Sequence, residues 1–253
     1  MLKRVFPQVV AVVLAVGVLA VQPAIATKGH HGGGGGGGGG TSWAQGVDVS
    51  HYQGTIDWNL VSAAGQRFAI AKATEGQTFT DNMYATNKGG ATAAGLRFTA
   101  YHFARPDTTA NDASLEADHF VQVAQLGSGN LIPALDLEVN GGLSVSALTT
   151  WVKAWLAEVA TKLGGVHAMI YTSPSFWQTS MGDSTWFANN GYSILWVAHW
   201  TSNSSPSVPA SNWGGHSWTF WQWTSCTHVN GISGCVDGDR YHFTDNFAQV
   251  TIP

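Results

Sequence analysis

Two carboxylates interrupt an otherwise apolar run of the chain, LIPALDLEVN at residues 131–140. The run is short and is bounded on both sides by asparagine and glycine, a pattern that favours a buried strand over a helix. Residues two positions apart on a strand share a face, so we expect Asp136 and Glu138 to be neighbours, with Cα atoms about 6.5–7 Å apart. Two close carboxylates in an apolar setting raise the proton affinity of at least one of them. One acid and one base from two carboxylates is the pair by which many glycosidases work.

Strand-like and helix-like runs alternate along most of the chain. The strand-like runs are residues 46–50, 67–74, 97–104, 131–138, 167–173, 193–200, 220–224 and 236–243. The helix-like segments are residues 57–64, 81–94, 110–126 and 144–163. Residues 201–219 and 225–235 lack helical periodicity, so we expect loops to join the last three strands. We predict an α/β fold, an irregular and incomplete TIM-like β/α barrel of eight strands, parallel at first and antiparallel near its end, with few helices after the fifth strand.

Polar residues follow most of these strands at or near their carboxyl ends. In β/α barrels the active site lies at that end of the strands. The residues placed there by the strand assignments are Asp48, Glu75, Tyr101, His102, Asp136, Glu138, Tyr171, His199, Trp200, Gln222 and Trp223. The sequence therefore predicts that the acids gather on one rim of the barrel.

The N-terminus has the pattern of a secretory signal peptide over residues 1–26. Lys3 and Arg4 precede a short apolar run, and small residues at 24–26 form a cleavage site. Residues 27–40 are rich in histidine and glycine, which predicts a flexible tether because this composition buries too little apolar surface to offset the entropy lost on ordering. Residues 41–253 suit one catalytic domain of barrel size. We therefore expect a secreted, extracellular protein without stable membrane insertion.

The charge balance excludes a basic nucleic-acid surface. The chain has 11 Lys and Arg against 15 Asp and Glu, so its net charge is negative. Only 10% of the residues are charged, and the position of each carboxylate therefore carries weight.

The 2 cysteines, Cys226 and Cys235, lie close together in CTHVNGISGC. Export and close spacing predict a disulfide that staples this loop. In the chain-entropy model, a loop of about ten residues makes such a bridge worth about 2.5–3 kcal/mol. The spacing is not that of a redox motif, and only His228 lies beside the pair, so we expect no metal site there.

Several motifs, in this order and spacing, resemble the glycoside hydrolase family 25 muramidases, also called Chalaropsis-type lysozymes. The resemblance covers residues 46–247, close to the whole domain. It is carried by GVDVSHYQGTIDW at 46–58, AIAKATEG at 69–76, YHFARP at 101–106, ALDLE at 134–138, IYTS at 170–173, WVAHW at 196–200, FWQWT at 220–224 and GISGCVDGDRYHF at 231–243.

The resemblance implies hydrolysis of the β-1,4 bond between N-acetylmuramic acid and N-acetylglucosamine in peptidoglycan, without a metal or other cofactor. It places the family's proton donor on Glu138 and the partner acid on Asp136. The first-strand acid falls on Asp48 and the late acid on Asp237, while Glu75 is a further acid to which we assign substrate binding. The resemblance leaves two mechanisms open, one through an enzyme nucleophile and one through the 2-acetamido group of the substrate.

The expected sugar groove lies at the same strand ends. We expect Tyr101, Tyr171, Gln222 and Trp223 to line it, together with Trp200, which stands where the family usually has tyrosine. The expected partner is the glycan strand of peptidoglycan, and the protein is expected to be a monomer.

Charge and burial predict where the catalytic proton resides. Glu138 is crowded by Asp136, Asp48 and Asp237, so its pKa should be raised until the group is protonated near neutral pH. Asp136 is expected to stay ionised.

Two other functions are weaker fits to the sequence. A family 18 chitinase also ends a strand in D-x-E, but it requires an acid two residues earlier, where this chain has Ala134. A non-catalytic, lectin-like wall-binding module would use the 12 tryptophans as sugar-stacking surfaces, but it has no need for acids gathered on one rim.

Overall fold

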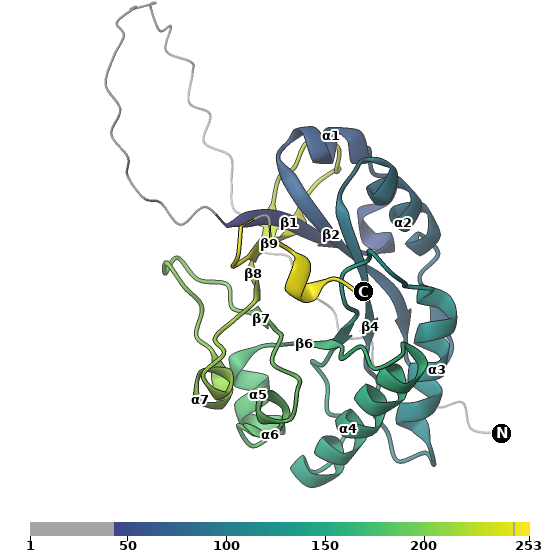
Figure 1. Cartoon of the computed structure of the whole chain (residues 1–253), viewed down its shortest axis with the longest axis vertical. Helices are drawn as coiled ribbons and strands as arrows, with labels where there is room; N and C mark the ends of the chain where they lie inside the picture. The colour runs from purple at the N-terminus through teal and green to yellow at the C-terminus, as the bar shows by residue number, and fades with distance from the viewer. Residues whose placement is uncertain (1–42, 245) are drawn as a thin grey trace, which may run out of the picture. The chain divides into compact units, whose positions relative to one another are not determined.

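The strands predicted from the sequence close into a barrel in a computed structural model, which describes residues 43–244 and 246–253 (Figure 1). The barrel strands are β1 (Ala44–Val49), β2 (Gln66–Glu75), β4 (Arg97–Phe103), β5 (Ala134–Asp136), β6 (Met169–Thr172), β7 (Leu195–Ala198), β8 (Phe220–Thr227) and β9 (Val236–Tyr241). A two-residue strand, β3 (Phe79–Thr80), pairs with the end of β2. The predicted signal peptide at 1–26 and the tether at 27–40 lie outside the described residues.

The sheet order is β1-β9-β8-β7-β6-β5-β4-β2-β3, and pairing of β1 with β2 closes the barrel. Neighbours from β1 through β2 and β4 to β8 run parallel, whereas β9 runs antiparallel to both β8 and β1. Parallel neighbours need long crossovers, but a short loop is enough for an antiparallel pair. The predicted barrel, with its antiparallel end, is therefore confirmed.

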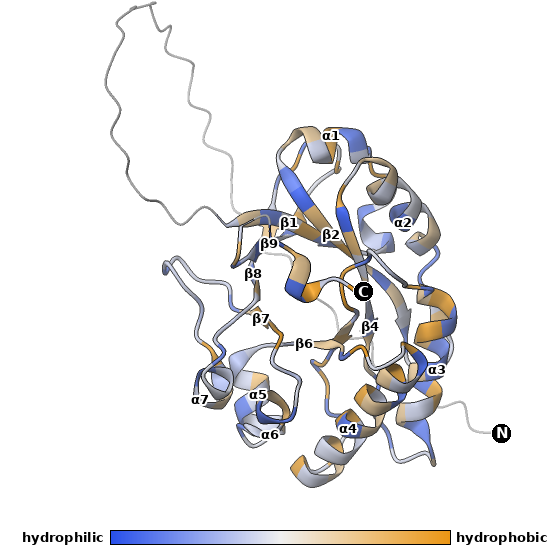
Figure 2. Ribbon diagram, viewed as in Figure 1, coloured by the Kyte–Doolittle hydropathy of each residue, from blue (hydrophilic) through white to orange (hydrophobic). Residues whose placement is uncertain are grey.

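Four helices lie inside the segments that periodicity predicts. They are α1 (Trp58–Ala63), α2 (Tyr84–Ala93), α3 (Asp112–Ala124) and α4 (Val145–Lys162). The Asp57 side chain caps α1, and the Ser144 side chain caps α4 by accepting from the Ala147 N–H. Figure 2 shows that α3 and α4 carry both apolar and polar residues, as expected of helices that cover a barrel.

Three short helices in the second half are absent from the sequence-based prediction. They are α5 (Pro174–Ser180) and α6 (Trp186–Asn189), between β6 and β7, and α7 (Pro209–Gly214), between β7 and β8. In α7, residues 210–213 have φ between 51° and 57°, so this single turn is left-handed and has no α-helical periodicity to detect. The buried Trp213 anchors it by donating to the Tyr192 carbonyl at 2.9 Å. The prediction that residues 201–219 are only loop is wrong for this turn.

Two apolar layers fill the fold. One lies between the barrel wall and the helices, and α4 contributes a stripe of buried residues to it: Leu148, Trp151, Val152, Trp155, Leu156 and Val159. The other fills the barrel itself and includes Phe68, Ile70, Ala134, Met169 and Phe220. The barrel is thus a packed core on which a site can rest at one end.

Candidate active site

Side chains that face into the barrel change from apolar to polar toward the carboxyl ends of the parallel strands. Alternate residues of a strand share a face. In β2, Lys72 follows the interior Phe68 and Ile70, and in β5, Asp136 follows the interior Ala134. The same step places Gln222 beyond Phe220 in β8 and Asp48 beyond Ala44 in β1. The alternation therefore places polar side chains at the carboxyl ends of the strands, above the apolar interior of the barrel.

Asp136 and Glu138 form the centre of this group. Strand β5 ends at Asp136, but the Leu137 N–H donates to the Tyr171 carbonyl at 3.0 Å and continues the extended pairing with β6. Glu138 therefore keeps the face of Asp136, as predicted, and their carboxyl groups are hydrogen bonded to each other. Asp136 is buried, whereas Glu138 lies at the mouth of the barrel.

Burial raises the pKa of both carboxyl groups of this pair. Burial raises the pKa of Asp136 well above its usual range, and the charge of Glu138 raises it further. Desolvation by the surrounding protein also raises the pKa of Glu138, although part of this side chain is exposed, but the hydrogen bond from Asp136 opposes that rise. Burial thus favours the protonated form of both groups, and the expectation that Asp136 stays ionised is not supported by its depth.

Asp48 is tied to the opposite side of the site by hydrogen bonds. Its Oδ2 accepts from Gln222 Nε2 at 2.9 Å, and Gln222 Oε1 in turn accepts from the Tyr171 hydroxyl at 2.9 Å and from Trp200 Nε1 at 3.0 Å. Burial, followed by the charge of Asp239, raises the pKa of Asp48 well above its usual range. The Gln222 amide thus fixes the side chains of Asp48, Tyr171 and Trp200 relative to one another.

Two acids of β9 complete the cluster. Asp237 pairs in register with Asp48 of β1, and Asp239 lies two positions deeper on the same face. Burial, together with the charge of Asp48, raises the pKa of Asp237 to about 8. Burial also raises the pKa of Asp239 to about 7, although hydrogen bonds from Asp48 and from Trp196 Nε1, the latter at 2.8 Å, oppose the rise. Sequence reasoning missed Asp239, although its spacing from Asp237 marks the same strand face.

Lys72 is a cation among these acids that the sequence reasoning also missed. It is buried, and its Nζ lies 2.5 Å from Glu75 Oε2. Glu75 also accepts from Arg105 Nε at 2.7 Å. Burial alone would raise the pKa of Glu75, but these bonds from Lys72 and Arg105 lower it below its usual value. Glu75 is thus an ion-pair partner, and it lies outside the two pockets described next.

Two adjoining pockets open at this rim. The first, here called the acid pocket, has a volume of about 200 Å³ and is lined by Asp48, Val49, Ser50, Tyr52, Gln53, Lys72, Tyr101, Phe103, Asp136, Glu138, Tyr171, Trp196, Gln222 and Asp237. The second, here called the open pocket, has a volume of about 550 Å³ and is lined by Glu138, Tyr171, Ser173, Pro174, Ser175, Gln178, Ala198, His199, Trp200 and Ser207. Only Glu138 and Tyr171 line both, so the Glu138 carboxyl stands at the junction.

The predicted groove residues divide between these pockets, with one exception. Tyr101 and Gln222 line the acid pocket, Trp200 lines the open pocket, and Tyr171 lines both. Trp223 lines neither, because it follows the interior Gln222 and so faces outward, where the guanidinium of Arg240 lies 4.5 Å from its ring. The expected groove contact of Trp223 is not supported by this placement.

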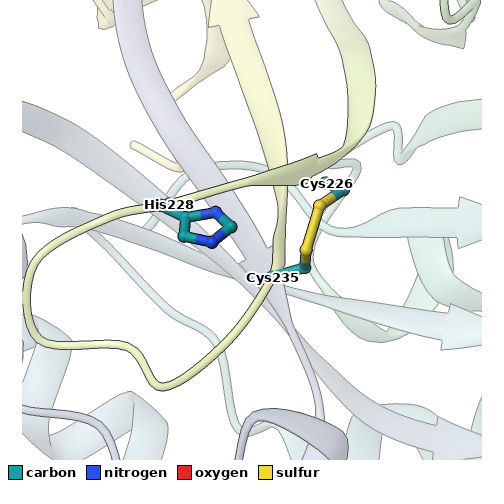
Figure 3. Close-up of side chains that lie close together, drawn as sticks. All are labelled: Cys226, His228 and Cys235. Atoms are coloured by element: carbon teal, nitrogen blue, oxygen red, sulfur yellow. A yellow bond between two sulfur atoms is a disulfide. The ribbon is translucent and has the colours of Figure 1, made fainter. Parts of the chain in front are cut away.

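Cys226 and Cys235 form a disulfide that closes the loop leading into β9 and Asp237 (Figure 3). The ring of His228 lies beside the two sulfurs, and the three side chains together have the composition of a metal-binding group. A metal-binding cysteine supplies a thiolate, however, and both sulfurs are used in the disulfide. The predicted bridge is present, and it acts as a loop staple.

Comparisons with known proteins identify the family of the chain. A model of the glycosyl hydrolases family 25 matches residues 47–232. The chain is 38% identical over 214 residues to lysozyme M1 of Streptomyces globisporus, covering 80% of this chain and 69% of the relative. It is 33% identical over 207 residues to an N,O-diacetylmuramidase of a Chalaropsis species, covering 77% and 94%. The crystal structure of the bacterial lysozyme from Streptomyces coelicolor matches with a TM-score of 0.73 at 35% identity, over 83% of this chain and 96% of that one.

Proposed function

The chain belongs to the glycosyl hydrolases family 25 and is a glycoside hydrolase, and we propose that it is a secreted muramidase of bacterial peptidoglycan. The bond to be cleaved is the β-1,4 linkage between N-acetylmuramic acid and N-acetylglucosamine. Relatives named as a lysozyme and as N,O-diacetylmuramidases support this substrate class. The N-terminal signal pattern supports an extracellular location.

The observation that carries the proposal is the position of Glu138 at the junction of the two pockets. A glycan that occupies both pockets has one of its glycosidic oxygens beside this carboxyl group. Cleavage requires a proton for that leaving oxygen, and Glu138 is the acid that can reach it from the mouth of the barrel.

Asp136 is the group from which Glu138 receives this proton. Its carboxyl group holds a proton against Glu138 through their mutual hydrogen bond, so a shift along that bond protonates Glu138 and leaves Asp136 ionised. The sugar left in the acid pocket then develops positive charge at its anomeric carbon, and the ionised Asp136 stabilises it directly or orients the 2-acetamido group that attacks it. Both routes use the same two residues.

The remaining groups hold this geometry. Asp48, bound by Gln222, and Asp237 form the opposite wall of the acid pocket, and Tyr171 links that wall to the junction.

Among the described residues, no helix has the length and apolar character needed to cross a bilayer. We propose that the protein acts as a monomer on glycan strands.

The test is digestion of purified peptidoglycan by the purified protein, with mass spectrometry of the products. A muramidase releases fragments that have N-acetylmuramic acid at the new reducing end. Fragments that end in N-acetylglucosamine would contradict the assigned bond, and an absence of new reducing ends would contradict hydrolysis.

A further inference from the structure

A row of aromatic rings extends beyond the acid pocket on the side of β1 and β3. Its members are His51, Tyr52 and Phe79, here called the aromatic ledge. The Tyr52 side chain is 82% exposed and Phe79 is 42% exposed. The His51 ring lies 4.1 Å from that of Tyr52 and 5.9 Å from that of Phe79, centroid to centroid, so the three rings are continuous. Exposed apolar surface of this kind marks a binding site more often than scattered single residues do.

The His51 ring and the backbone that carries Tyr52 are held in place before anything binds to the ledge. His51 and Tyr52 belong to the 3-10 helix η1 (His51–Gln53), which the Ser50 and Gln53 side chains close in a reciprocal capping box. The buried Asp81 accepts from the His51 N–H at 2.9 Å and lies 2.7 Å from His51 Nδ1. A ring that is already fixed loses little conformational entropy on binding, and the energy of stacking is then available for affinity.

The position of the ledge relates it to the substrate path. Around the barrel, β1 and β2 are separated from β6 and β7 by two intervening strands on each side, so they lie across the rim from each other. The open pocket lies at β6 and β7, where Trp200 lines it, whereas the ledge follows β1 and its Tyr52 lines the acid pocket. A chain that passes from the open pocket over Glu138 into the acid pocket therefore leaves that pocket toward the ledge.

We propose that the aromatic ledge binds a further pyranose ring of the glycan strand, outside the two pockets, and makes the enzyme favour long strands over short oligomers. This inference rests on the proposed function. Aromatic side chains pair an apolar face with polar edges, which matches a sugar that has an apolar C–H face and hydroxyl groups around its rim. The continuity of Tyr52 with the acid pocket favours a glycan over an unrelated protein as the occupant.

The experiment compares two substrates, the shortest muramic acid–glucosamine oligomer that the enzyme cleaves and peptide-free glycan strands from purified peptidoglycan. For Tyr52→Ala and separately for Phe79→Ala, the loss in kcat/KM should be about fivefold larger on the long strands, mostly through KM. Phe243→Ala is the matched control. Phe243 is 45% exposed and follows β9 at the opposite end of the barrel, where Tyr241 pairs with Ala44, the first residue of β1. It should show no dependence on length.

The outcomes separate the ledge from the proposed function. Equal losses on both substrates, or no loss with either variant, would overturn the ledge while the parent enzyme still cleaves glycan. A parent enzyme that cleaves neither substrate would instead contradict the function on which it rests. Tyr52→Phe keeps the aromatic ring and should retain the preference for long strands. If this variant lost the preference, that result would also count against stacking.

Discussion

The carboxyl groups of Asp136 and Glu138 share a hydrogen bond, and burial raises the pKa of both. A bond between two carboxyl groups needs one proton, so the pair is competent when it holds a single proton and loses its acid when that proton leaves. The charge of the nearby Lys72 lowers the pKa of both groups. The pH range of activity therefore depends on the pKa of these two carboxyl groups, which burial raises and the charge of Lys72 lowers.

Replacing Lys72 by Met should shift the alkaline limb of the kcat/KM profile to higher pH. Without the cation, both carboxyl groups hold their shared proton to a higher pH, because the ionised form is less stabilised. Lys72→Arg keeps the charge and is the control. The readout is the pH at half-maximal kcat/KM, which does not depend on any overall loss of rate. A limb that stays in place or moves to lower pH would contradict this role of Lys72.

Asp136→Asn should lower kcat by about 10²–10⁴-fold, because the amide that replaces the carboxyl group has no proton to pass to Glu138 and no charge to place beside the anomeric carbon. Glu75→Gln is the comparison. Glu75 lines neither pocket and is engaged with Lys72 and Arg105, so its loss should be milder. Release of reducing ends gives the rates, and circular dichroism confirms the fold. A larger loss in Glu75→Gln than in Asp136→Asn would reverse the assignment.

The free energy of unfolding should fall as the pH is raised from about 4 to 8. Burial raises the pKa of Glu116, which lies 2.7 Å from His102 Nε2, to about 8. Burial lowers the pKa of His102 to about 3, and this opposes the fall only below the usual pKa of histidine, about 6.5. A carboxyl group whose pKa is higher in the folded protein holds a proton that the unfolded chain releases, so its contribution is present at low pH and is lost as the pH rises through 8. Each such group steepens the fall by up to about 1.4 kcal/mol per pH unit.

Urea unfolding across this range tests the effect with Glu116→Gln, which cannot ionise and should flatten the dependence. Glu158→Gln is the matched control, because Glu158 lies on the outer surface of α4, 3.3 Å from Lys162, and its loss should leave the slope unchanged. An unchanged slope in Glu116→Gln would show that Glu116 has no raised pKa.

Removing the disulfide with Cys226→Ser and Cys235→Ser together should lower the free energy of unfolding by about 2.5–3 kcal/mol, since the bridge closes a loop with a sequence separation of 9. The same loop leads into Asp237, so kcat should also fall, in proportion greater than the loss of folded protein. Unfolding curves with and without reductant give the comparison for the parent. Equal stability of the reduced and oxidised forms would contradict this stabilising role of the disulfide.

Much of the site could be predicted from strand ends and from alternation along strands. The rule that barrel sites lie at carboxyl ends places Asp48, Asp136 and Glu138 together. Asp237 lies at the start of the antiparallel strand β9, and only the family resemblance pointed to it. The same alternation, applied inward from Asp237, finds Asp239, and applied to β8 it turns Trp223 away from the groove. Both placements follow from the period of two along a strand.

Other features could not be read from one sequence. The helices α5, α6 and α7 are each too short to show a periodic stripe, and α7 is held by the burial of Trp213 and by a left-handed turn. The pKa of Asp136 is raised chiefly because this side chain is buried, and its burial is set by how the surrounding strands close over it. Local sequence contains no measure of that closure.

The central claim is that Glu138 supplies the proton, and Glu138→Gln tests it most directly. The amide keeps the shape and hydrogen bonding of the side chain but has no acidic proton. Hydrolysis of purified glycan should therefore fall by about 10²–10⁴-fold at every pH from about 4 to 8, while binding to peptidoglycan and the circular dichroism spectrum stay as in the parent. Activity within a few-fold of the parent, in a folded variant, would contradict the account and would direct attention to Asp48.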